Sequence, residues 1–162
     1  MINRQKYYFN IYISITIAIL LTTIPLSDYF LIVEFDWIVL VVLFWLIIYP
    51  EKFSLISVWV CGIIIDVMSG NLLGQNAFSL LVVSFMSIIA HRQIKTMPLL
   101  QQSIIISFLV FVYRLINLWL NGIIGIQTPD MLVYFLNPLL LILIWPLAFS
   151  SLSMFVGKTY KF

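Results

Sequence analysis

The sequence predicts an all-α membrane protein whose chain crosses the bilayer six times. Its 162 residues are 64% hydrophobic and only 9% charged, whereas a soluble domain of this size carries roughly 25% charged residues. So few polar side chains cannot cover a water-exposed globule. The apolar runs are also continuous, which is typical of membrane helices, whereas membrane β-barrels alternate apolar and polar residues. A third observation, the placement of the basic residues, gives the number of crossings.

Seven of the eight Lys and Arg residues occupy alternate gaps between the apolar runs, and they predict the orientation of the chain. The gaps without Lys or Arg are 26–36, 69–76 and 122–131. Because cytoplasmic loops carry an excess of basic residues, both termini are predicted to be cytoplasmic. Arg114, inside the fifth run, is the exception. The basic residues in the gaps are Arg4, Lys6, Lys52, Arg92, Lys95, Lys158 and Lys161.

Six spans follow from the apolar runs and are predicted to form one transmembrane domain, residues 1–162. The first span is expected to stay uncleaved, because no small-x-small cleavage pattern follows it. It ends near Pro25, and the second span ends at Pro50, since proline cannot continue a helix. The spans are predicted at about residues 7–26, 31–49, 53–68, 76–90, 99–121 and 131–156.

The third, fourth and sixth spans have unusual lengths. The third and fourth are shorter than the roughly 20 residues that a span needs, and the glycine-rich segment 69–76 between them is predicted to dip into the membrane. Gly70 and Gly74 flank this turn, so their freedom in φ explains them better than helix dimerisation. The sixth span would rise roughly 39 Å. Pro138 and Pro146 give it two places to bend.

Arg114 is the residue most costly to place in a bilayer, and it is expected to face the bundle interior. Asn117 and Asn121 lie on the same helix face. This polar stripe is either a ligand, ion or partner site or, as we favour, a structural feature, in which Arg114 joins an interhelical hydrogen-bond network or extends toward the outer headgroups. Asp66 is the predicted counter-charge of Arg114, because such a pair lowers the cost of burying each charge. Gly62 shares a face with Asp66, which would let a neighbouring helix approach closely.

Several function classes find no support in the sequence. Asp66 is the lone convincing acid within a span, and no G-x-S-x-G occurs, so we expect neither catalytic residues nor enzyme activity. His91 has no Cys or acidic neighbours, so neither a metal site nor a cofactor is expected. The basic residues are too scattered to indicate a nucleic-acid partner.

Two segments resemble the MreD family of bacterial rod shape-determining membrane proteins. Residues 43–50 read LFWLIIYP, a Trp-containing helix that ends in proline, and residues 62–74 combine Gly-x-x-x-Asp with Gly-x-x-x-Gly. Arg114 does not belong to this pattern. The residues that carry it are Pro25, Pro50, Gly62, Asp66, Gly70, Gly74, Asn137, Trp145 and Pro146.

The resemblance implies a non-enzymatic component of the cell-elongation complex in the bacterial cytoplasmic (inner) membrane. It implies binding to MreC, and membership of a larger complex with the actin-like MreB filament, RodA and a class B penicillin-binding protein, among membrane lipids. Proteins of this family help to organise sidewall peptidoglycan synthesis and so maintain rod shape. The implied fold is similar to that of the substrate-binding subunits of energy-coupling-factor vitamin transporters.

We expect the bundle to grip the single transmembrane helix of MreC through small residues, which allow close packing in lipid. The alternative is a small-molecule- or lipid-binding membrane transport subunit, with Asp66, Arg114 and Asn117 around a pocket that opens outward. The predicted small-residue faces comprise Ser54, Ser57 and Cys61 on the third span and Ala77, Ser84, Ser87 and His91 on the fourth. The residues assigned to partner binding or structure are Pro50, Gly62, Asp66, Gly70, Gly74, Asn137 and Pro146.

Overall fold

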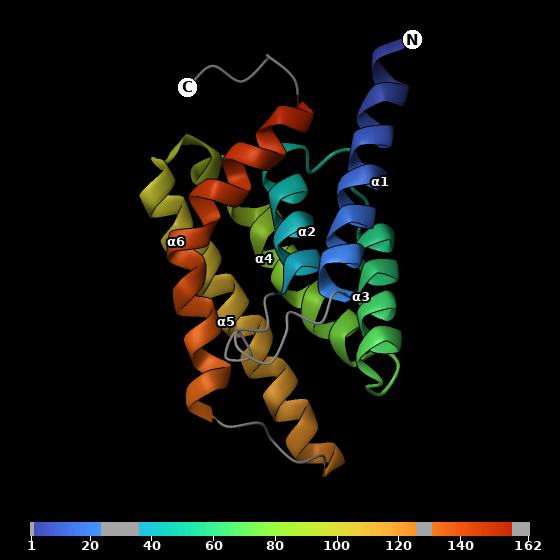
Figure 1. Cartoon of the computed structure of the whole chain (residues 1–162), viewed down its shortest axis with the longest axis vertical. Helices are drawn as coiled ribbons and strands as arrows, with labels where there is room; N and C mark the ends of the chain where they lie inside the picture. Colours follow the sequence, from blue (N-terminus) through green and yellow to red (C-terminus); the bar gives the residue numbers. More distant parts are fainter. Residues whose placement is uncertain (1, 24–35, 126–130, 157–162) are drawn as a thin grey trace.

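Six α-helices, in the predicted order, make up the part of the chain that the structure describes (Figure 1). The structure is a computed structural model, and it describes residues 2–23, 36–125 and 131–156. Pro25 and the first residues of the predicted second span lie outside these ranges. The helices are α1 (Ile2–Thr23), α2 (Trp37–Ile48), α3 (Leu55–Ser69), α4 (Gln75–Thr96), α5 (Leu99–Ile124) and α6 (Met131–Val156).

Several helix ends follow from local sequence. The Ser54 hydroxyl accepts the backbone N–H of Ile56 at 3.2 Å and so caps the start of α3. Helix α4 runs to Thr96, past the predicted end at Ala90, because the basic residues that follow Ala90 still favour helix although they leave the apolar run. Helix α6 continues through both of its prolines, and Figure 1 shows its axis changing direction.

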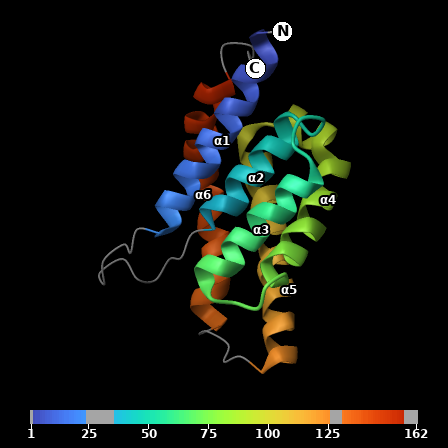
Figure 2. The same cartoon turned by 90° about the vertical axis from the view of Figure 1, so that its right-hand side faces the viewer.

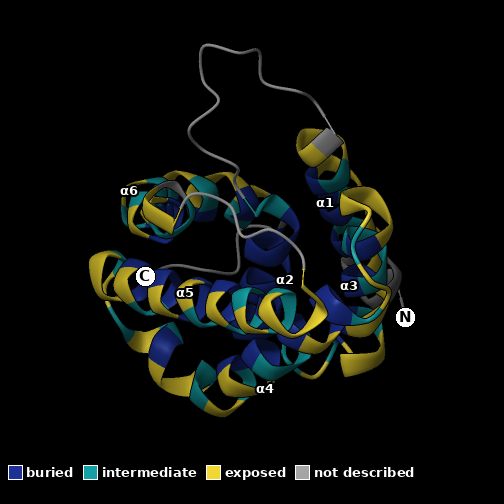
Figure 3. Cartoon of the chain, turned by 90° about the horizontal axis from the view of Figure 1, so that it is seen from below, coloured by how far each residue is buried: buried dark blue, intermediate teal, exposed yellow. Residues whose placement is uncertain are grey.

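Helix α2 forms the centre of the bundle. Every residue from Ile38 to Ile48 is buried, and Figure 3 shows this helix between α1, α4, α5 and α6. Its 12 residues rise only about 18 Å, well short of a bilayer core. The Trp45 indole N–H donates to the Ser14 hydroxyl at 2.7 Å and so ties α2 to α1. The Phe44 and Phe149 rings pack edge to face at 5.5 Å, which joins α2 to α6.

The outer helices match a lipid environment. Among the described residues, α4, α5 and the stretch Tyr134–Met154 of α6 are long and apolar enough to cross a bilayer, whereas the apolar parts of the other helices are shorter. The outward side of α6 presents Leu139, Leu143 and Leu147, which are 63%, 72% and 71% exposed. Side chains of this kind are stable facing acyl chains but unfavourable facing water.

Candidate functional site

Asp66 joins the end of α3 to the start of α4. Its side chain is fully buried, and its carboxylate accepts the backbone N–H groups of Gly74 and Asn76, each at 2.8 Å, and more weakly that of Ala77 at 3.5 Å. The first N–H groups of a helix have no partner within the helix. Gly74, at the cap position, has no side chain to offer them, so Asp66 supplies the acceptor from the preceding helix. Its negative charge also suits a helix N-terminus.

The turn between α3 and α4 requires two glycines. Gly70 has φ +65° and Gly74 has φ +100°, values that residues with a Cβ rarely adopt. The backbone N–H groups of Gly70 and Asn71 both donate to the Asp66 carbonyl, which closes the end of α3. The prediction that these glycines serve a turn is therefore confirmed.

Gly62 lets the two helices of this hairpin touch backbone to backbone. A Cβ added to Gly62 would lie 2.2 Å from the Cα of Ala77, far inside van der Waals contact. The predicted close approach of a neighbouring helix at this face is thus confirmed, and the neighbour is α4. Gly62, Asp66, Gly70 and Gly74 therefore belong to one unit, which we call the α3–α4 hairpin, residues 55–96.

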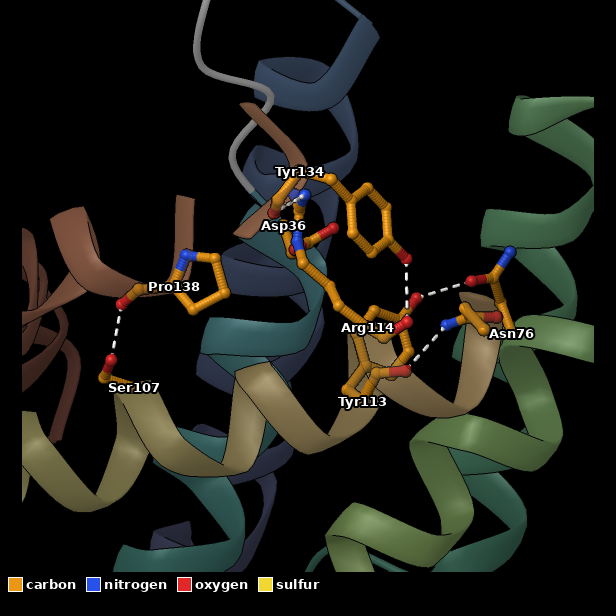
Figure 4. Close-up of polar contacts among 8 residues, drawn as sticks. Asp36, Asn76, Ser107, Tyr113, Arg114, Tyr134 and Pro138 are labelled. Carbon is orange, nitrogen blue, oxygen red and sulfur yellow. Dashed lines mark hydrogen bonds and ion pairs between the residues drawn. The ribbon is translucent and has the colours of Figure 1, made fainter. Parts of the chain in front are cut away.

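A layer of polar side chains connects the start of α4 to α5. The Tyr113 hydroxyl donates to Asn76 Oδ1 at 2.6 Å, and Gln75 Nε2 donates to Asn121 Oδ1 at 2.6 Å. Asn117 donates to the Tyr113 carbonyl at 3.2 Å within α5. Figure 4 shows Tyr113 directed toward Asn76. Asn76 therefore bonds to Asp66 through its backbone N–H and to Tyr113 of α5 through its side chain.

Arg114 does not pair with Asp66, and this prediction is wrong. Its Nε forms an ion pair with Asp36 Oδ2 at 2.7 Å, and its Nη1 donates to the Tyr134 carbonyl at 3.0 Å. The Tyr134 hydroxyl returns a bond to the Arg114 carbonyl at 2.9 Å, and the guanidinium lies over the Tyr134 ring (Figure 4). Arg114 thus joins the start of α2 to α5 and α6, whereas Asp66 faces α4.

The reason for the error is geometric. Asp66 and Arg114 are the acid and the base that the sequence places inside spans, but a position along a span does not give the direction in which a side chain points. The partner that the sequence did not predict is Asp36, which lies in the gap 26–36 that holds no Lys or Arg. An acid immediately before a very apolar helix was the available signal, because it can reach a buried Arg from that helix end.

The other predicted site residues lie apart from the hairpin turn. Pro50 is in the turn between α2 and α3, at the opposite end of α3, where the Lys52 N–H donates to the Tyr49 carbonyl at 3.0 Å. Asn137 is buried and Pro146 is half-buried, both within α6. The structure therefore brings together four of the seven residues assigned to partner binding or structure, and it separates the remaining three.

The predicted small-residue surface is inside the bundle. Cys61, Ala77, Ser84 and Ser87 are 4%, 0%, 0% and 0% exposed, so they cannot form a face for a partner helix. Ser54 is exposed, whereas Ser57 and His91 are half-buried. The outward sides of the hairpin carry large apolar residues instead, as the exposed outer edges in Figure 3 illustrate. These include Ile56, Trp59, Val60, Phe78, Phe85 and Ile89.

Asp66, Arg114 and Asn117 each bond inside the bundle as described above, and the outward pocket around them stays a prediction. An open groove of about 480 Å³ lies between the second half of α5 and the start of α6, and its lining is apolar. Its lining residues are Leu115, Leu118, Trp119, Gly122, Ile123 and Met131. Within the described ranges, no three His, Cys, Asp or Glu side chains gather where they could hold a metal ion.

The chain matches the model of a known protein family. A family model described as rod shape-determining protein MreD matches residues 3–155, nearly the whole chain. No solved structure matches the chain. The similarity to the substrate-binding subunits of energy-coupling-factor transporters therefore stays a prediction.

Proposed function

Because the chain belongs to the MreD family of rod shape-determining membrane proteins, we propose that it is a non-enzymatic scaffold of the cell-elongation complex. In this role it binds MreC in the bacterial cytoplasmic membrane and helps to organise sidewall peptidoglycan synthesis. MreB, RodA and a class B penicillin-binding protein are its proposed further partners in a larger complex.

The observation that carries the scaffold proposal is the use of Asp66. Its carboxylate, which belongs to the lone convincing acid that the sequence places within a span, is fully buried and accepts three backbone N–H groups at the start of α4. A carboxylate held in this way fixes a helix pair in place. Gly62 lets the two helices pack closely, and Gly70 and Gly74 form the turn between them. The residues of the family pattern in this hairpin therefore build a rigid platform.

The face of α3 that points away from α4 is our proposed contact for the MreC helix. Helix α3 packs chiefly on α4 and only slightly on α2. Its free side presents Ile56, Trp59 and Val60, which are 73%, 49% and 46% exposed, with Ser57 half-buried beside them. A transmembrane helix laid against this stripe would gain van der Waals contact along α3, and packing of this kind drives helix association in lipid.

Co-purification of MreC with this protein tests the proposal. Replacing Val60 by Trp places a bulky ring in the contact, so MreC recovery is expected to fall at least about tenfold, equivalent to about 1.4 kcal/mol. Leu143→Trp on the exposed side of α6 is the matched control and should leave recovery unchanged. Gel filtration of both variants checks that the bundle stays folded. Unchanged recovery with Val60→Trp, or loss only with Leu143→Trp, would overturn the proposed contact.

The proposed orientation places both termini and the basic turns in the cytoplasm. A cysteine at Ile124, which is 41% exposed near the end of α5, should then react with a membrane-impermeant maleimide in spheroplasts, in a chain whose own Cys61 is replaced by Ala. A cysteine at the exposed Thr96 should react only after lysis. The reverse pattern would invert the topology.

A further inference from the structure

We propose that the turn of the α3–α4 hairpin, residues 70–74, is a lipid-facing surface that inserts Leu72 and Leu73 among acyl chains. In this position Asp66 replaces water as an acceptor for backbone N–H groups: its carbonyl accepts those of Gly70 and Asn71, and its carboxylate accepts those of Gly74 and Asn76. The leaflet concerned is the one opposite the basic residues Lys52, Arg92 and Lys95. The inference goes beyond the proposed scaffold function, and it holds whether or not MreC binds.

The length of the hairpin places the turn inside the hydrocarbon region. Helix α3 has 15 residues and rises about 22 Å, and α4 from Gln75 to Ala90 rises about 24 Å. Lys52 and Arg92 hold the other ends of these segments at one membrane surface, while a hydrocarbon core is about 30 Å thick. Figures 1 and 2 both show the turn stopping short of the end of α5 along the long axis.

The side chains at the turn suit lipid better than water. Val67, Leu72 and Leu73 are 67%, 58% and 64% exposed, so a turn in water would display an apolar patch. Ser69 is also exposed and Asn71 is half-buried, and these polar groups need headgroups or water nearby. The combination indicates a depth just beneath the headgroups rather than at the bilayer centre.

The backbone N–H groups on either side of Leu72 and Leu73 have acceptors within the protein, which suits a depth just beneath the headgroups. Irregular backbone within a membrane is stable only where its polar groups are satisfied, because lipid offers no partners. Here Asn71 donates to the Asp66 carbonyl, Gln75 donates to the Leu72 carbonyl, and Gly74 and Asn76 donate to the Asp66 carboxylate. One buried acid therefore serves three of these four donors, with its carbonyl and both carboxylate oxygens.

Power-saturation electron paramagnetic resonance measures the environment of the turn. A nitroxide on Leu73→Cys, in a Cys61→Ala chain reconstituted alone into lipid nanodiscs, reports collisions with apolar oxygen and with a water-soluble nickel chelate. Leu143→Cys on α6 is the lipid-facing reference, and Glu51→Cys in the exposed turn after α2 is the water-facing reference. Because the turn is placed just beneath the headgroups and residue 143 lies at the middle of α6, we expect the oxygen-to-nickel ratio at residue 73 to lie below that at residue 143 and to exceed that at residue 51 several-fold.

Two results would overturn the inference. A ratio equal to that of residue 51 would place the turn in water, and low collision rates with both reagents would show that protein, such as a second copy of the chain, covers it. The role of Asp66 is tested by adding Asp66→Ala to the labelled chain. Nickel collisions at residue 73 should rise as water solvates the freed N–H groups, while those at residue 143 stay constant. No rise would remove Asp66 from the account.

Discussion

Gly62 of α3 and Ala77 of α4 meet so closely that a Cβ on the glycine would lie 2.2 Å from the Cα of the alanine. The atoms opposite Gly62 are the Cα, N and Cβ of Ala77, none of which can rotate away. The spacing of the whole hairpin therefore depends on the absence of one methyl group.

Gly62→Ala should force α3 and α4 apart. Overpacking a buried contact costs about 1–3 kcal/mol, and a backbone neighbour puts this site at the upper end of that range. Thermal unfolding in detergent should show a lowered midpoint. Gly122→Ala is the matched control, since nothing lies within 4 Å of the added Cβ, and its midpoint should be unchanged or slightly raised. Equal stability of the two variants would mean that the close approach is not present in solution.

Replacing Asp66 should destabilise the start of α4 in proportion to the acceptors removed. Asp66→Asn keeps one oxygen acceptor, whereas Asp66→Ala leaves buried N–H groups without a partner, at about 1–3 kcal/mol each. We therefore expect a larger loss of unfolding free energy for Ala than for Asn, measured by titration with a denaturing detergent. Ser54→Ala removes the exposed cap of α3 and should cost only about 1 kcal/mol. An Ala variant as stable as wild type would refute the capping role.

Arg114 should be energetically coupled to Asp36 and not to Asp66. In a double-mutant cycle of Asp36→Asn and Arg114→Leu, the coupling energy should exceed about 1 kcal/mol, because the two side chains bond at 2.7 Å. The parallel cycle of Asp66→Asn with Arg114→Leu is the control, and its two effects should add within about 0.5 kcal/mol. The opposite ranking of the two coupling energies would restore the pair that the sequence suggested.

The sequence predicts the helices and their order, but it does not predict which residues of each helix pack against other helices and which face lipid. Continuous apolar runs gave the order of six helices, and glycine chemistry gave the turn at Gly70 and Gly74. Hydropathy does not separate lipid-facing from buried residues in a membrane, because both environments are apolar. Small residues such as Ala77 and Ser84 are consistent with an external partner or with internal packing, and the structure shows the second.

The sequence does not predict the ion pair of Arg114 for a similar reason. Helical periodicity shows which residues share a face, as for Arg114 and Asn117, but it does not show which helix that face meets. That information comes from the packing of α2 at the centre of the bundle, which brings Asp36 to Arg114. The sequence signal for such a central helix is its unbroken apolar stretch from Ile38 to Ile48, with a length too short to span a bilayer.

The central claim is that the hairpin is a platform whose outward α3 face binds MreC. Photo-crosslinking in growing cells tests it most directly, with benzoylphenylalanine placed at Ile56 or, as the control, at Leu143, which are 73% and 72% exposed. The account predicts an adduct with MreC from residue 56 and none from residue 143. An adduct from residue 143 alone, or no adduct from residue 56 in cells where MreC co-purifies with the protein, would contradict it.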